Sequence, residues 1–433
     1  MDFVVHSSKL KGAVRIPGSK SHTIRAVAAA ALASGASAIR NPLESADARA
    51  ARRAYGLLGA AITETPDCWH IQGTGGLFET PGDVIDVGNS GTTMRMALGS
   101  AALLRSGKAV LTGDGQVRQR PCGPLAEALN ALGAQVEATR GNGMPPFVVS
   151  GPMRGGKATV EAVTCQYVSA LLMNAPLAES DTLLLVPMLN EKPYVIMTLD
   201  WLQKQGVQVA HDDGLSEFHI PGGQQYQPVQ RAIPADFSSA TFFLAAGALP
   251  GNDVLCQGLD MEDTQGDKAV VDYLQAMGAE ISREQDGIRV CAGALRGAEL
   301  DLNATPDALP MMAALACFAE GETRLVNVPQ ARLKETDRIT VMRMELEKLG
   351  ARITELDDGM IIEGARLHGG DVAGHGDHRV IMALAIAASA MTEEVRIHGA
   401  DAVDVTYPGF VQDLAQLGGA IQVADATEAN DAT

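Results

Sequence analysis

The chain of 433 residues is short of positive charge. Lysine and arginine together number 34, against 52 aspartates and glutamates, so the formal net charge is −18. A protein that binds nucleic acid generally needs a basic face to neutralise phosphates. The composition therefore argues against a nucleic-acid partner, and it makes the positions of the few cations informative.

Cysteine pairs and long apolar runs are also lacking. The six cysteines include no CxxC pair, so neither a disulfide scaffold nor a zinc site is expected. No apolar run reaches the ~18 residues of a membrane-spanning helix. The first residues lack the basic and apolar segments of a signal peptide. We expect a cytoplasmic protein that does not act in a membrane.

Aromatic residues make up only 4% of the chain, whereas 46% of residues are hydrophobic and 20% are charged. This is a globular composition, with a core expected to consist mainly of Ala, Leu, Val and Met. The length suggests about two to four domains.

An internal repeat organises the chain. A helical pattern ends in Leu-Gly-Ala or a close relative, and an apolar strand follows. The glycines of the six copies are Gly59, Gly133, Gly206, Gly278, Gly350 and Gly418. Glycine is favoured there because helices commonly end with a residue at positive φ. The spacing predicts six α/β units of about 72 residues, each with two helices and several strands. A solenoid and two groups of three units both remain possible.

Short polar clusters recur with a similar spacing, each before an Ala-, Leu- or Met-rich helix. They lie at residues 19–21, 89–92, 164–166, 236–239, 306–307 and 377–379. The polar segment 224–234 is predicted to be a linker or crossover, with a domain boundary near residue 235. Residues 424–433 are expected to form a frayed tail.

These clusters have two interpretations. Any one of them is more simply explained as a helix N-cap. However, helix N-termini also bind phosphate and carboxylate, and six cations lie in or beside these turns: Lys20, Arg25, Arg120, Lys334, Arg338 and Arg379. A cleft that gathered these groups would suit an acidic small molecule.

Three local motifs stay ambiguous on spacing alone. The segment from Lys334 to Arg338 is either a solvated helix start or a set of phosphate-binding cations beside an acid. Asp307 is either a cap or a general base. The segment from His375 to His378 is better explained as a turn with a helix cap than as a metal site.

Five motifs occur together and in order: residues 17–21 with Arg25, 88–92 with Arg95, 120–121, 334–338 and 377–379. With them the chain resembles the 5-enolpyruvylshikimate-3-phosphate synthases of the enolpyruvyl transferase superfamily, over essentially its whole length. Relatives that act on UDP-N-acetylglucosamine fit less well, because their catalytic-loop cysteine has no obvious counterpart here.

The resemblance implies a two-domain α/β (α+β) fold, an inside-out α/β barrel in which each domain has three β-α-β-α-β-β units. The N-terminal domain would span residues 17–234. The C-terminal domain would combine residues 1–16, as a short first strand, with 235–433. The active site would lie in the cleft between the domains.

The resemblance also implies a reaction. The carboxyvinyl group of phosphoenolpyruvate would pass to the 5-hydroxyl of shikimate 3-phosphate, with release of phosphate, in a monomer that needs no metal or organic cofactor. Asp307 would be the base at the acceptor hydroxyl, and Glu335 and Lys20 would move protons at phosphoenolpyruvate.

The implied binding residues follow from the same motifs. Those for phosphoenolpyruvate are Lys20, Gly91, Arg120, Gln166, Arg338 and Arg379. Those for shikimate 3-phosphate are Lys20, Ser21, Arg25, Thr164, Cys165, Gln166, Asp307, Gln330 and Lys334.

Four residues depart from the family pattern. Cys165 stands in place of a serine, and Gln330 in place of an asparagine. Glu191 replaces a serine that helps to hold the acceptor phosphate, so its carboxylate must turn away, pair with a cation or face a different acceptor. Val405 replaces a lysine that contacts phosphoenolpyruvate, and no lysine follows Lys348.

Three functional hypotheses follow. The chain is a divergent synthase of the shikimate pathway, an enolpyruvyl transferase with another cyclic alcohol as acceptor, or a non-catalytic ligand-binding relative. We favour the first, because Ser21, Arg25, Asp307 and Lys334 are all present.

Overall fold

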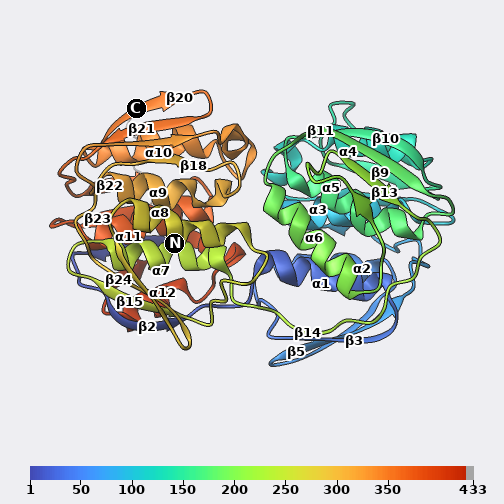
Figure 1. Cartoon of the computed structure of the whole chain (residues 1–433), viewed down its shortest axis with the longest axis horizontal. Coiled ribbons are helices and arrows are strands. Elements are labelled where there is room, and N and C mark those ends of the chain that lie inside the picture. Colours follow the sequence, from blue (N-terminus) through green and yellow to red (C-terminus); the bar gives the residue numbers. More distant parts are fainter. Residues whose placement is uncertain (426–433) are drawn as a thin grey trace. The chain divides into compact units, whose positions relative to one another are not determined.

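The computed structural model describes residues 1–425, and the chain divides into two compact units (Figure 1). Unit 1 contains residues 1–17, 235–261 and 267 onward, and unit 2 contains residues 18–234 and 262–266. The expected tail lies outside the described residues from residue 426 on. Within residues 1–425, no helix is long and apolar enough to cross a membrane.

One motif of six elements recurs throughout both units. Its clearest copy is β10 (Gly156–Ala162), α5 (Cys165–Asn174), β11 (Thr182–Leu189), α6 (Lys192–Lys204), β12 (Ala210–His211) and β13 (Glu217–Ile220). Strand β10 pairs in parallel with β11, and β13 pairs antiparallel with both β11 and β12. The expected β-α-β-α-β-β unit is confirmed, and it forms one four-stranded sheet with two helices.

Unit 2 holds two further copies. The first consists of β14 (Gln230–Ala232), α1 (Lys20–Leu32), β3 (Ser34–Arg40), α2 (Ala46–Leu57), β4 (Ala61–Thr65) and β5 (Cys68–Thr74). The second consists of β6 (Ile85–Asp86), α3 (Gly91–Ala101), β7 (Ala109–Thr112), α4 (Gly123–Ala131), β8 (Gln135–Ala138) and β9 (Phe147–Ser150).

Unit 1 holds the other three copies. The first consists of β2 (Lys11–Arg15), α7 (Phe237–Ala248), β15 (Asp253–Gln257), α8 (Val270–Ala276), β16 (Glu280–Glu284) and β17 (Gly287–Cys291). The second consists of β18 (Glu299–Asp301), α9 (Leu309–Ala316), β19 (Glu322–Val326), α10 (Arg338–Lys348), β20 (Arg352–Leu356) and β21 (Gly359–Glu363). The third consists of β22 (Gly370–Ala373), α11 (His378–Ser389), β23 (Val395–His398), α12 (Phe410–Gln416), β24 (Ala420–Ala424) and β1 (Asp2–His6).

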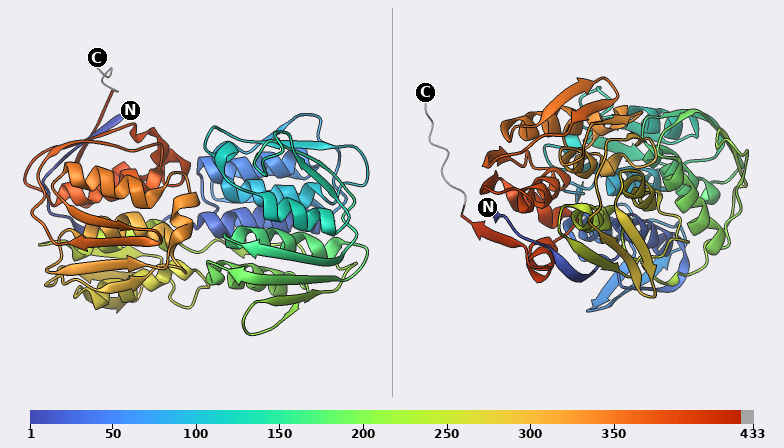
Figure 2. Two further views of the ribbon diagram at one scale, coloured as in Figure 1. Left: turned by 90° about the horizontal axis from the view of Figure 1, so that it is seen from above. Right: turned by 60° about the vertical axis from the view of Figure 1, so that its left-hand side comes forward.

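Some sheets are completed by strands from distant parts of the chain. The first 16 residues were expected to supply one strand, but they supply two: β1 lies between β23 and β24, and β2 pairs in parallel with β15. Figure 2 shows these blue N-terminal strands beside the later strands of unit 1. The segment 224–234 is likewise more than a linker, because β14 pairs in parallel with β3 and Tyr226 is buried.

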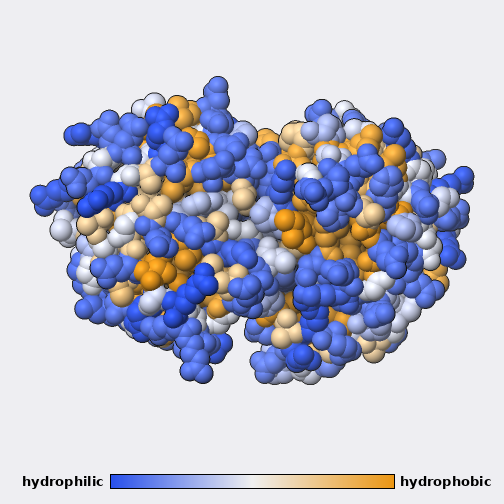
Figure 3. All heavy atoms as spheres, in the orientation of Figure 1, coloured by the Kyte–Doolittle hydropathy of each residue, from blue (hydrophilic) through white to orange (hydrophobic). Residues whose placement is uncertain are grey.

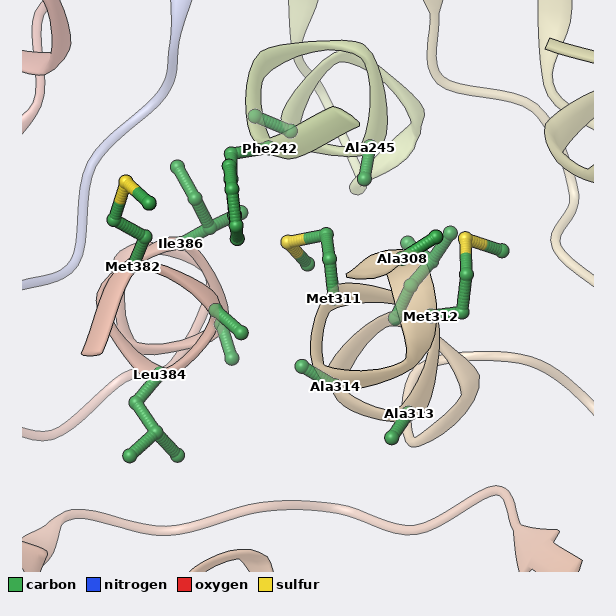
Figure 4. Packing of buried hydrophobic residues seen from close by; sticks show 14 of the residues in the cluster. Phe242, Ala245, Ala308, Met311, Met312, Ala313, Ala314, Met382, Leu384 and Ile386 are labelled. Atoms are coloured by element: carbon green, nitrogen blue, oxygen red, sulfur yellow. The ribbon is translucent and has the colours of Figure 1, made fainter. Parts of the chain in front are cut away.

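The helices that open each repeat form the cores of the two units. Every residue of α7, α9 and α11 is buried. A helix that is apolar on all sides is stable only where other elements surround it. In Figure 4, Phe242 of α7, Met311 of α9 and Ile386 of α11 point into the space that these helices share. Alanines let the helix backbones approach closely, which explains a core with few aromatic residues.

The repeat glycines have the backbone conformation that the sequence predicts, and most of the visible surface is hydrophilic. The six repeat glycines have φ between +78° and +105°, as predicted for residues that end helices. Figure 3 shows hydrophilic residues over most of the visible face, broken by smaller hydrophobic areas.

Candidate active site

The polar clusters at the helix starts are partly structural. The side chains of Ser19, Ser90, Thr164, Asp236 and Asp377 each accept a hydrogen bond from a backbone N–H in the first turn of the following helix. The capping interpretation is therefore confirmed at five of the six clusters, including the turn before His378. Other side chains of these clusters, such as Lys20, Gln166 and Arg379, do not cap the helices.

Arg338 is the centre of the densest polar cluster in unit 1, and its side chain is 0% exposed. Its Nε donates to Asp377 Oδ2 over 2.8 Å, and its Nη1 donates to Asp307 Oδ1 over 2.7 Å. Its Nη2 donates to Glu335 Oε2, also over 2.7 Å. Burial alone would lower the pKa of Arg338, but the charges of these three carboxylates outweigh burial and raise it.

Within the segment from Lys334 to Arg338, this cluster excludes a solvated position for Arg338. Helix α10 begins only at Arg338, with Asp337 as its N-cap, and the arginine is buried rather than solvated. Its partners Asp307 and Asp377 lie 31 and 39 residues away in sequence. Arg338 is therefore part of a buried charge network, whereas residues 334–337 remain partly exposed.

Asp307 lies in the short 3-10 helix η4 (Pro306–Ala308), and it is not the N-cap of that turn or of α9. Besides Arg338, its carboxylate meets Arg379 Nη2 at 3.0 Å and Lys334 Nζ at 3.9 Å. Three cations stabilise its anionic form, and 21% of the side chain remains exposed. Asp307 thus lies beside three cations and remains accessible, and a base must be accessible to the proton that it abstracts.

Asp377 holds this cluster together. Its Oδ1 accepts from the backbone N–H of Arg379 at 2.9 Å, while both carboxylate oxygens bind Arg338. Burial would raise the pKa of Asp377, but the charge of Arg338 outweighs burial and lowers it. The carboxylate therefore joins the start of α11 to the start of α10. Another predicted residue of unit 1, Gln330, donates from its Nε2 to Asn303 O at 2.9 Å.

In unit 2 the predicted residues gather at the starts of α1, α3 and α5. Lys20 is the first residue of α1, and its Nζ lies 3.2 Å from Asp47 Oδ2. Arg25, one turn later, is buried and donates to Thr198 Oγ1 at 2.9 Å and to the carbonyl of Ser21 at 3.1 Å. Burial lowers the pKa of Arg25, and nearby groups that include Glu191 oppose this.

Gly91 opens α3 against two guanidinium groups. A Cβ at this position would lie 2.5 Å from Arg95 Nη1 and 2.7 Å from Arg120 Nη1. Arg120 Nη2 donates to Asn89 Oδ1 over 3.4 Å. The absence of a side chain at Gly91 is what lets both arginines approach the start of the helix.

Glu191 precedes α6 in the chain, and its side chain reaches the first residues of α5. Its Oε2 accepts from Thr164 Oγ1 at 3.0 Å and from the backbone N–H of Cys165 at 3.1 Å. It is 1% exposed, so the carboxylate has not turned away to solvent. Val405 is half-buried in η6 (Ala400–Val405).

Unit 2 also has a groove, and residues 1–425 hold no candidate metal site. An open groove of about 560 Å³ between α6 and the β12–β13 hairpin contains none of the predicted site residues. Among residues 1–425, no group of three or more His, Cys, Asp or Glu side chains could hold a metal ion.

Comparison with known proteins decides the family. The family model for EPSP synthase (3-phosphoshikimate 1-carboxyvinyltransferase) matches residues 4–414. The chain belongs to the EPSP synthase family. A 3-phosphoshikimate 1-carboxyvinyltransferase of Ruminiclostridium cellulolyticum is 50% identical to it over 98% of this chain and 100% of the relative. One of Acetivibrio thermocellus is 51% identical over 97% of this chain and 99% of the relative.

A solved EPSP synthase structure from Acinetobacter baumannii agrees in fold. It superposes with a TM-score of 0.82 at 27% identity, over 98% of this chain and 100% of that one. The two-domain inside-out α/β fold of EPSP synthases is therefore the fold of this chain.

Sequence reasoning overlooked two carboxylates in this chain. Asp47 pairs with Lys20, but an acidic residue in the first turn of a helix has an ordinary explanation in the helix dipole. Asp377 stood within a recognised motif, and its capping position concealed its second role as a partner of Arg338.

Proposed function

We propose that this chain transfers the carboxyvinyl group of phosphoenolpyruvate to the 5-hydroxyl of shikimate 3-phosphate and releases phosphate. The observation that carries the proposal is the cluster around Arg338. It places an accessible carboxylate, Asp307, and a second carboxylate, Glu335, beside three cations in a chain of this family.

Asp307 is the proposed base. The acceptor hydroxyl must lose a proton as it attacks C2 of phosphoenolpyruvate, and the exposed part of this carboxylate can receive it. Lys334 and Arg379 hold the carboxylate from two sides, so its direction is fixed before substrate arrives. Such preorganisation is typical of catalytic acids and bases.

Glu335 and Lys20 are proposed to handle the proton at the methylene carbon of phosphoenolpyruvate. Glu335 Oε2 accepts a hydrogen bond from Arg338 Nη2. The carboxylate of phosphoenolpyruvate would compete for the same guanidinium, because arginine suits bidentate binding of carboxylates. Substrate binding would thereby release Glu335 from the guanidinium, and once its carboxylate has taken up a proton from solvent it could deliver that proton to the methylene carbon.

The residues of unit 2 bind the remaining charges in this proposal. Lys20, Gly91, Arg120 and Gln166 would bind phosphoenolpyruvate together with Arg338 and Arg379 of unit 1. Ser21, Arg25, Thr164 and Cys165 would bind the acceptor together with Gln330 and Lys334.

We propose that the chain acts as a monomer in the cytoplasm. All six cysteines are free thiols, which suits a reducing compartment. Light scattering at micromolar concentration tests the monomer, and a mass near twice 45.2 kDa would contradict it.

A phosphate-release assay tests the reaction. Purified protein with phosphoenolpyruvate, shikimate 3-phosphate and a metal chelator should release phosphate, and omitting either substrate should stop the release. Shikimate without its phosphate is the matched control for the acceptor. Release that depends on some other cyclic alcohol would replace the proposed acceptor, and binding of both ligands without release would refute catalysis.

A further inference from the structure

Glu191 is held in a position that is unfavourable in isolation. It precedes α6 with φ of +58°, a left-handed backbone that residues other than glycine seldom adopt. Its side chain is also almost completely buried, and a buried carboxylate is costly unless it is paired. The surroundings must therefore favour the anion at this place.

Three groups in unit 2 do so. Thr164 Oγ1 and Cys165 N donate to the same carboxylate oxygen. The N–H of Cys165 belongs to the first residue of α5, where the helix dipole is positive. The buried guanidinium of Arg25 supplies a full positive charge close enough to interact with Glu191. Together these groups form an anion site, and a side chain of the chain itself occupies it.

The proposed function assigns the same groups to the acceptor, and the family pattern has at position 191 a serine that helps to hold the acceptor phosphate. Thr164 Oγ1 and Cys165 N each have one hydrogen to donate. Neither group can donate a full hydrogen bond to a carboxylate and to a phosphate at the same time. A phosphate and a carboxylate that shared these donors would also repel each other strongly, because charges interact more strongly in a buried setting than in water. The acceptor phosphate and the carboxylate of Glu191 therefore exclude one another.

We propose that Glu191 determines the affinity for the acceptor by occupying its phosphate position in the unliganded chain. This inference rests on the proposed function. An arriving acceptor must displace the carboxylate, so Glu191 weakens acceptor binding and leaves phosphoenolpyruvate binding unchanged.

Two variants separate the effects of charge and size. Glu191→Ser removes the carboxylate and supplies a small hydroxyl, and its Kd and KM for shikimate 3-phosphate should fall by about tenfold or more. Glu191→Gln keeps the volume but removes the charge, so a smaller fall of about threefold is expected. In both variants the KM for phosphoenolpyruvate should stay within twofold of that of the unchanged chain.

A matched control is Glu161→Ser. This residue is an exposed glutamate on β10, three positions before Thr164, so the variant loses the same charge nearby without touching the site. Calorimetric titration with shikimate 3-phosphate, and with inorganic phosphate as a minimal probe, measures Kd directly. The control should bind both as the unchanged chain does.

The outcomes separate two kinds of failure. If the unchanged chain turns over shikimate 3-phosphate but both Glu191 variants bind it equally well or more weakly, the displacement role is wrong and the proposed function stands. If the unchanged chain neither binds nor uses shikimate 3-phosphate, the proposed function and this inference both fail. Should Glu191→Ser not fold, as judged by thermal unfolding, an unchanged Kd in Glu191→Gln overturns the inference.

Discussion

Replacing Gly91 by alanine should damage the phosphoenolpyruvate site without harming the fold. The added Cβ would lie 2.5 Å from Arg95 Nη1 and 2.7 Å from Arg120 Nη1, and ordinary contact begins near 3.4 Å. The nitrogens must therefore retreat by about 0.7 to 0.9 Å. Both are the far ends of flexible side chains, so the displacement costs little folding free energy.

The magnitude follows from what Arg120 is proposed to do. A hydrogen bond to a charged group contributes ~1.5–3 kcal/mol, which corresponds to roughly 10- to 150-fold in an equilibrium constant. A misplacement of ~1 Å at a reacting centre can likewise cost ~10²-fold. We expect the KM for phosphoenolpyruvate to rise by about tenfold or more in Gly91→Ala, with the KM for the acceptor little changed.

The control variant is Gly56→Ala. This glycine also lies in a helix, α2, but a Cβ there would meet nothing within 4 Å. Both substitutions should raise the free energy of unfolding slightly, by ~0.4–1 kcal/mol, because alanine restricts the unfolded chain. Steady-state kinetics with each substrate varied in turn, together with urea unfolding, measure both effects. An unchanged KM for phosphoenolpyruvate in Gly91→Ala would refute the assignment of Arg120.

Two other predictions test the remaining chemistry and the charges. Asp307→Asn keeps one oxygen that can accept from Arg338 or from Arg379, but its amide cannot accept the proton, so kcat should fall by ~10²-fold or more with both KM values within about threefold. A kcat within threefold of the original would remove Asp307 from the role of base. The pKa of Glu355 is lowered to about 2, because hydrogen bonds from Arg343, Thr340 and Arg332 outweigh the opposing effect of burial. Its stabilising contribution is therefore complete above its ordinary pKa of 4.5 and is lost as pH falls toward 2. The difference in unfolding free energy between the unchanged chain and Glu355→Gln should shrink over that range, and a constant difference would contradict the assignment.

The repeat was predictable because its signals are local. A glycine at positive φ follows the second helix of each repeat, and a capping side chain opens five of the six helices that follow the polar clusters. Both depend on residues a few positions apart. The strands that join from elsewhere left no such signal. Strand β14 has only three residues, none of them buried, so its sequence shows no apolar alternation.

The site was predictable in composition but not in its contacts. Local spacing left open whether Arg338 belongs to a solvated helix start or to a set of phosphate-binding cations, because two of its partners come from other places in the chain. Glu191 likewise finds Thr164 27 residues away. Burial of a charge depends on partners that the fold brings together, and local spacing does not encode them.

The measurement that tests the central claim most directly is the structure of the product. Phosphate release alone does not distinguish transfer from hydrolysis of phosphoenolpyruvate, whereas carbon NMR of the reaction mixture does. The account predicts a carboxyvinyl ether on the 5-oxygen of shikimate 3-phosphate, formed in equal amount to the phosphate released. Free pyruvate as the only organic product, or an ether at another oxygen, would contradict it.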